Sequence, residues 1–221
     1  MAGPSGPRNA TDPGALTAIV RFVGDPLPVP AEVPVSTTVP ACAHSIFTED
    51  LLVDRETRGI GNVVLRLEGI ARGKAPPERV TVINRSCRFE PHVAVAVKGT
   101  RIALENADVV LHHTRVDLAG SNFFRASLPA GDPAPPARPI SGSGIMELTC
   151  EIHKWMRAYV YVHTNPYLAV TDPTGTLRIE SIPPGRYPYV AWHESVGEKR
   201  GEVEIVAGQP TELVLELAAP Q

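Results

Sequence analysis

The chain has 221 residues and a formal net charge of −3, so it lacks the strongly basic balance of a protein that binds DNA or RNA through its surface. Hydrophobic residues make up 43% and charged residues 20%, as in a globular protein with length for one large or two modest domains. The 23 prolines and 18 glycines would interrupt helices and therefore favour an all-β fold.

The first third of the chain predicts a tail, a strand, a loop and two further strands. Residues 1–14 are rich in Gly, Pro and Asn and indicate a flexible tail, and "ALTAIVRFVG" then predicts the first strand. The proline-rich stretch 25–40 is extended or loop-like. "EDLLVD" and "NVVLRLEGI" are the next strand-like runs, and Val63, Leu65 and Leu67 fall on one face of the second.

The middle of the chain continues the strand pattern. In "PHVAVAVKGTRIALEN", Val93, Val95 and Val97 alternate with small alanines, which fits a strand buried on both faces. Residues 98–100 form a turn before the next strand. Residues 128–144, "LPAGDPAPPARPISGSG", predict a loop, and "IMELTC" and "RAYVYVH" predict strands after it.

The last quarter indicates a separate small domain. After a boundary near 164–166, the runs "TLRIESI", "YPYVAWHE", "GEVEIVA" and "ELVLEL" are separated by turn signals, as in a small β-sandwich. We therefore expect an all-β chain with a tail at 1–14, a first domain at 15–163 and a C-terminal β-sandwich at 164–221, with no helix longer than a turn or two.

A group of possible metal ligands lies in "CEIHKWM", where Cys150, His153 and Met156 are spaced three residues apart. Blue-copper sites use two imidazoles and one thiolate, with a weak axial methionine. The second imidazole must come from elsewhere, and the candidate is His112 in "LENADVVLHHTRV", with His113 beside it. The alternative is a sandwich without metal, in which Cys150 and Met156 only fill the core.

The same residues resemble a known family. The stretch "CRFEPHVAVAVKGTRIALENADVVLHH" resembles the middle of a cupredoxin, and "CEIHKWM" resembles the C-x2-H-x2-M ligand loop of amicyanin; the match covers roughly 80–163. The residues that stand in the family's order are Phe89, Pro91, Gly99, Asn106 and His112. The resemblance implies a Greek-key cupredoxin sandwich.

The resemblance also implies one mononuclear type 1 copper site. Its ligands would be His112, Cys150, His153 and Met156. Cupredoxins usually place Asn after the first His ligand to fasten the two ligand loops, whereas this chain has His113, so either the fastening or the binding imidazole differs. A binuclear centre would need a second cysteine at the position of Lys154.

The part after Asn165 is similar to the carboxypeptidase regulatory-like, transthyretin-like β-sandwich module. Together the two parts resemble bacterial exported proteins labelled as methylamine-utilisation or plastocyanin-like proteins. That resemblance implies a periplasmic or extracellular protein, although the opening "MAGPSGPRNATDPGAL" has no apolar region of a signal peptide, which leaves a cytosolic protein or a mature form open. No apolar run approaches the roughly 20 residues that span a bilayer.

Three cysteines are consistent with one disulfide and one thiol with another role. Pairing Cys42 with Cys87 leaves Cys150 for the metal, and three unrelated cysteines are the alternative. His44, His92 and His193 are expected to be structural; the alternatives are that His92 is a fifth ligand or belongs to a second site, and that His193 docks against the copper domain.

A site with all four ligands bound has no open position for substrate, so we expect outer-sphere electron transfer to a redox partner protein and no enzyme activity. His153 would be the electron port, within an apolar collar that includes Trp155 and Phe123. Two other functions remain open. One is a copper-handling protein for delivery or storage, and the other is a cell-envelope interaction module with a vestigial site.

Overall fold

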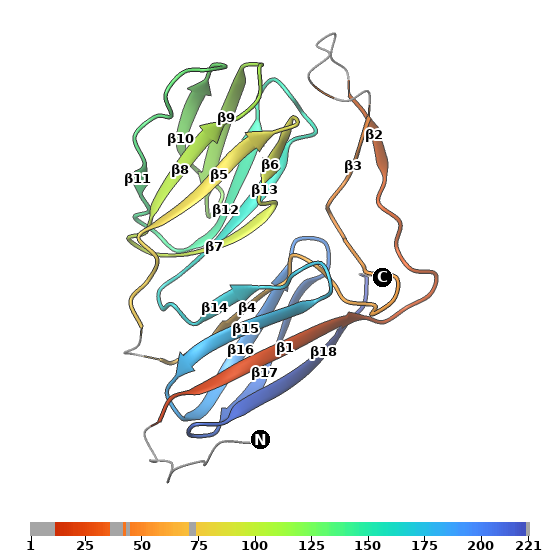
Figure 1. Cartoon of the computed structure of the whole chain (residues 1–221), viewed down its shortest axis with the longest axis vertical. Coiled ribbons are helices and arrows are strands. Elements are labelled where there is room, and N and C mark those ends of the chain that lie inside the picture. Colours follow the sequence, from red (N-terminus) through yellow and green to blue (C-terminus); the bar gives the residue numbers. More distant parts are fainter. Residues whose placement is uncertain (1–11, 36–41, 43–44, 71–73, 220–221) are drawn as a thin grey trace, which may run out of the picture. The chain divides into compact units, whose positions relative to one another are not determined.

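The computed structural model describes residues 12–35, 42, 45–70 and 74–219, and every regular element among them is a β-strand (Figure 1). This confirms the predicted all-β class. Within the same residues, no helix is long and apolar enough to cross a membrane.

The chain folds into two compact units, and the first is built from three separate segments. Unit 1 comprises Met1–Val29, Leu51–Lys74 and Tyr167–Gln221, and unit 2 comprises Pro30–Asp50 and Ala75–Pro166. The chain leaves unit 2 close to the boundary predicted near 164–166. The predicted first domain, 15–163, differs from unit 2. The first strand and the Val63–Leu67 run belong to unit 1 instead, because their pairing partners are strands of the C-terminal segment.

Unit 1 contains two sheets. The first has the order β15-β1-β18 and the second β14-β4-β16-β17. The bounds are β1 Gly14–Phe22, β4 Val64–Leu67, β14 Leu168–Val170, β15 Thr176–Ile182, β16 Gly185–His193, β17 Gly197–Ile205 and β18 Pro210–Leu217. Alternate β1 side chains from Leu16 to Phe22 are buried. This period of two gives β1 one apolar face, which is buried in the core of unit 1.

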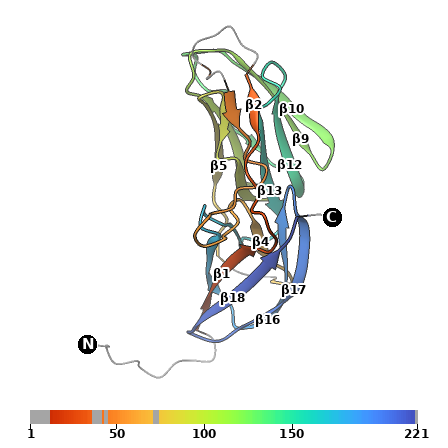
Figure 2. The same ribbon diagram turned by 90° about the vertical axis from the view of Figure 1, so that its right-hand side faces the viewer.

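Unit 2 contains a five-stranded sheet, a four-stranded sheet and a short hairpin. The orders are β10-β9-β12-β13-β7, β11-β8-β5-β6 and β2-β3. The bounds are β2 Glu32–Pro34, β3 Ser45–Phe47, β5 Arg79–Arg85, β6 Arg88–Glu90, β7 Val93–Val97, β8 Arg101–Asn106, β9 His112–Leu118, β10 Ser121–Leu128, β11 Arg138–Pro139, β12 Gly144–Cys150 and β13 Arg157–His163. Figure 2 shows β5 in one layer and β9, β10 and β12 in the other. Neighbouring strands that are not consecutive in the chain make this a Greek-key β-sandwich.

Strand alternation in unit 2 determines which side chains enter its core. In β12, Met146, Leu148 and Cys150 are buried and alternate with less buried neighbours. In β9, His112 and Thr114 are buried in the same way. The inward faces of β9 and β12 therefore carry the imidazole and the thiol into the same core. The β7 strand is mostly buried along its length, as predicted.

Candidate metal centre

The candidate centre lies where β9 begins and β12 ends. The two strands are antiparallel neighbours, with Cys150 opposite Thr114, so the start of β9 and the end of β12 meet at one end of the sheet. His112 opens β9 and Cys150 closes β12. A six-residue loop, 151–156, then carries His153 and leads into β13.

Three of the four predicted ligands have donor atoms close enough together to hold one metal ion. The Cys150 Sγ atom is 3.9 Å from His112 Nδ1 and 3.7 Å from His153 Nδ1, and the two Nδ1 atoms are 3.0 Å apart. Metal–nitrogen and metal–sulfur bonds are about 2.0–2.3 Å long, so donors on one ion lie about 3–4 Å apart. All three side chains are at most 6% exposed. The donor set therefore fits a soft metal such as copper.

The ligand loop is closed by its own backbone. Met156 N donates to the His153 carbonyl over 2.9 Å, and Cys150 N donates to the Met156 carbonyl over 3.4 Å. His153 N points at Cys150 Sγ, 3.5 Å away. The Met156 side chain is buried at 2% exposure in the core of unit 2. The loop thus keeps the sequence-predicted thioether on the same short turn as the thiol and the imidazole.

Electrostatics favour the protonation states that bind metal. Burial raises the pKa of the Cys150 thiol, but hydrogen bonds to the sulfur, among them those from the backbone of His153 and Ile152, outweigh burial, and the pKa falls below its ordinary value. Burial lowers the pKa of His153, and the neighbouring His112 lowers it further. A thiolate and a neutral imidazole are the ligand forms, so both shifts favour metal binding.

His113 lies outside the donor group. Burial along β9 alternates, with His112 and Thr114 buried and His113 between them only half-buried, so its side chain points to the other face of the sheet. Its backbone carbonyl accepts a hydrogen bond from Glu151 N over 2.8 Å. A backbone hydrogen bond therefore fastens the start of β9 to the ligand loop. Among the described residues, His112 is the imidazole of β9 that faces Cys150.

Sequence reasoning did not identify Asp108. Its Oδ2 atom lies 2.9 Å from His112 Nε2, and its side chain is 8% exposed. An ionised carboxylate can only accept a hydrogen bond, so this contact places an acceptor behind the His112 ring, on the side away from Cys150. The only sequence signal was an acidic residue four positions before the candidate histidine.

The predicted disulfide is present, and Trp155 connects it to the ligand loop. Cys42 pairs with Cys87, and Cys150 is the free cysteine. Trp155 Nε1 donates to the Cys87 carbonyl over 3.0 Å, and the Trp155 ring centroid is 5.2 Å from that of His153. The indole is thus half-buried between the disulfide and the loop. Phe123, the other predicted collar residue, is also packed against the core.

The remaining predicted histidines lie apart from the donor group. His92 is buried, 3.9 Å from Glu49 and edge-on to the Tyr159 ring, in keeping with the expected structural role. His193, in unit 1, is fully buried, and its Nδ1 atom accepts from Ser195 N. His44 lies outside the described residues.

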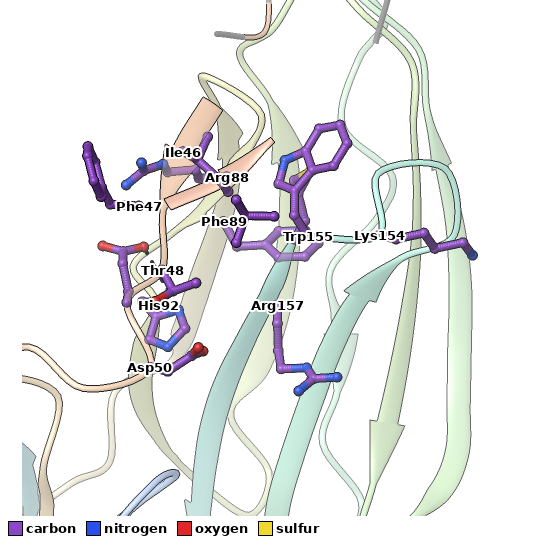
Figure 3. Close-up of a pocket in the computed structure, with 13 residues that line it drawn as sticks. Ile46, Phe47, Thr48, Asp50, Arg88, Phe89, His92, Lys154, Trp155 and Arg157 are labelled. Atoms are coloured by element: carbon purple, nitrogen blue, oxygen red, sulfur yellow. Dashed lines mark ion pairs between the residues drawn. The ribbon is translucent and has the colours of Figure 1, made fainter. Parts of the chain in front are cut away.

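A pocket of about 220 Å³ lies beside the ligand loop within unit 2. Trp155, Met156 and Phe89 line one side, and Phe47 and Thr48, at the end of the β2–β3 hairpin, line another. Figure 3 shows the Trp155 ring at this pocket, whereas the Lys154 side chain extends away from the other residues. One side of the ligand loop therefore borders an open pocket instead of packing against other side chains.

No protein-family profile matches the chain, and no curated protein matches it. Among solved structures, a copper-containing nitrite reductase from Thermus scotoductus is 20% identical over 44% of this chain and 25% of its own, with a TM-score of 0.32. Amicyanin from Paracoccus versutus is 16% identical over 44% of this chain and 96% of its own, with a TM-score of 0.33. A reduced amicyanin variant is 12% identical over 44% of this chain and 97% of its own, with a TM-score of 0.34. The chain spans about a quarter of the nitrite reductase. Because these scores are low, the fold assignment above depends on strand order alone.

Proposed function

We propose that this protein is an exported type 1 copper protein that acts in outer-sphere electron transfer. The observation that carries the proposal is the buried group of two imidazole Nδ1 atoms and one thiol within 4.8 Å of one another. With Met156 as the fourth ligand, no position remains for substrate, which argues for a carrier rather than an enzyme. Bound copper supplies a one-electron couple.

The chain's own residues support this role by holding the donors before metal arrives. His112 is fixed by Asp108, and Cys150 and His153 are held by the closed loop. Rigid donors change little in geometry between oxidation states, and this keeps the energetic cost of electron transfer low.

Exposed apolar side chains flank the ligands and support docking of a redox partner protein. Ile152 is 45% exposed beside His153, and Leu111 is 39% exposed beside His112. The Glu151–His113 backbone hydrogen bond brings these two segments together. Ile152 and Lys154 on the loop are exposed, but His153, the predicted electron port, is only 6% exposed. We therefore assign the docking contact to Ile152 and Leu111 rather than to the inward-packed Trp155 and Phe123.

The Cys42–Cys87 disulfide supports export, because disulfides persist in oxidising compartments such as the periplasm or the extracellular space. We further propose that unit 1 is a carboxypeptidase regulatory-like module that carries no copper. Within the described residues, the groups able to hold a metal lie in unit 2.

Titration of the metal-free protein with Cu(II) tests the proposal. We expect an intense visible thiolate-to-copper charge-transfer band at one equivalent, abolished in Cys150→Ser and retained in His113→Ala as the matched control. A colourless copper-bound wild type, or a coloured Cys150→Ser variant, would refute a type 1 site. Reversible voltammetry separates the carrier from a storage protein, for which tight Cu(I) binding without a reversible couple is expected.

A further inference from the structure

We propose that Asp108 is a positioning residue that fixes the tautomer and orientation of His112 and links the candidate metal centre to the Ser86–Cys87 turn between β5 and β6. This inference rests on the proposed function only for its effect on copper; its effect on His112 holds in the metal-free protein.

The hydrogen bonds around Asp108 determine where the proton lies. Its Oδ1 atom accepts from Ser86 N over 2.6 Å, and its Oδ2 atom accepts from Cys87 N over 3.0 Å. Both oxygens are thus acceptors, and Oδ2 also faces His112 Nε2 at 2.9 Å. His112 is then the donor in that contact, which leaves Nδ1 unprotonated toward Cys150.

The two amides that hold the carboxylate belong to a turn with an unusual backbone. Ser86 and Cys87 connect β5 to β6 and have φ angles of 52° and 55°, the left-handed region that Asn and Gly usually occupy in such a turn. Neither residue favours that region, so the turn needs outside support. Asp108 binds both amides, the disulfide holds Cys87, and Trp155 binds the Cys87 carbonyl.

Asp108 is itself held in place by Asn106. Asn106 Oδ1 accepts from Asp108 N over 3.0 Å, and Asn106 Nδ2 donates to the carbonyls of Val110 and Leu128, each over 2.8 Å. The loop between β8 and β9 is therefore tied to its own end and to β10. The backbone of Asp108 is thus fixed, and its carboxylate contacts His112 from a defined position.

The chemical consequence is a bias toward the oxidised metal. A carboxylate that accepts from the distal nitrogen of a ligating imidazole makes the imidazole a stronger donor, and loss of such a partner typically costs 10–100-fold in metal affinity. The added negative charge favours Cu(II) over Cu(I). Asp108 should accordingly lower the midpoint potential relative to a neutral residue in the same place.

The first test uses wild-type protein without metal. Nitrogen-15 NMR of the imidazoles reports which ring nitrogen is protonated, and we expect His112 in the Nε2–H form. An Nδ1–H tautomer at His112 would overturn the proposal without any variant. This readout does not involve copper, so it stands even if the protein proves not to bind the metal.

The second test compares Asp108→Asn with Asp117→Asn. Asp117 lies five residues along β9 from His112, about 17 Å at the rise of a strand. The Asp117→Asn substitution therefore removes the same charge from the same unit, far from His112. In Asp108→Asn we expect loss of the tautomer preference and about tenfold more loss of Cu(II) than of Cu(I) affinity in chelator competition, or a midpoint about 59 mV higher. Asp117→Asn should change neither. Equal losses of Cu(II) and Cu(I) affinity, or an unchanged His112 tautomer, would refute the proposal.

Discussion

Removal of the Cys42–Cys87 disulfide gives a direct measure of how far loop closure stabilises unit 2. The bridge spans 45 residues of sequence. The chain-entropy relation for a closed loop of that size gives about 4 kcal/mol at 25 °C. We therefore expect the double variant Cys42→Ala/Cys87→Ala to lose about 4 kcal/mol of unfolding free energy. Alanine is chosen because Cys42 and Cys87 are at most 4% exposed and serine would bury two hydroxyls.

The assay is urea unfolding monitored by Trp155 fluorescence. The chain has two tryptophans, so a Trp192→Phe background leaves Trp155 as the reporter of unit 2. The matched control is Cys150→Ala, which truncates another buried sulfur without opening a loop and should cost about 1 kcal/mol. If the double variant loses no more than twice the unfolding free energy that Cys150→Ala loses, the removal of packed sulfur atoms alone explains the loss and the loop-closure argument fails. Copper binding should weaken but persist in the folded double variant, since Asp108 still holds the backbone amides of Ser86 and Cys87 while the bridge no longer restrains the turn.

Three further changes probe the axial ligand and unit 1. Met156→Leu should keep the visible copper band and raise the midpoint potential in voltammetry, because thiolate and imidazoles remain while the axial donor is lost; a colourless variant would contradict this. Asp172→Ala should cost unit 1 about 1 kcal/mol at neutral pH in urea unfolding, since its carboxylate accepts from the Thr174 and Thr176 amides. Burial raises the pKa of Asp172, but hydrogen bonds from the Thr174 hydroxyl and from the Thr176 and Thr174 amides lower it overall. The loss of stability on substitution should therefore shrink as pH falls below about 4, and a loss that is independent of pH would refute this reasoning. Gly59→Ala places a Cβ atom 1.8 Å from the Thr174 carbonyl oxygen and should cost about 3 kcal/mol or more in thermal unfolding, whereas Gly61→Ala, with no atom closer than 3.5 Å, should stay within about 1 kcal/mol of wild type.

Period-two patterns in the sequence predicted the strands well, because burial of alternate residues is a local property. Leu16–Phe22 in β1 and the alternation in β12 are examples. The partner of each strand could not be predicted in this way. The sequence placed β1 with the strands that follow it, yet β1 pairs with β18 in parallel, nearly 200 residues later. A strand's hydrophobic face indicates that it needs a core, and it does not indicate which core.

The same distinction holds at the candidate centre. The spacing of Cys150, His153 and Met156 was visible because one short loop carries all three. His112 was predicted through its resemblance to a family pattern, and the strand alternation of β9 then decided between it and His113. Asp108 could not be predicted, because its role depends on a turn at Ser86 and Cys87 that meets it only after β5, β6 and β8 have paired.

The hydrogen bonds behind the candidate ligands show how the protein supports the candidate centre. His112 is held through Asp108, and the ligand loop is held through Trp155, and both connections end at the one β5–β6 turn. Because both segments of candidate ligands are held by this one turn, the turn must be rigid to keep them in place relative to each other. The disulfide meets that need at Cys87, the residue whose amide and carbonyl make the two contacts. The bridge therefore supports the candidate metal centre as well as the fold of unit 2, and the free cysteine, Cys150, lies among the candidate ligands.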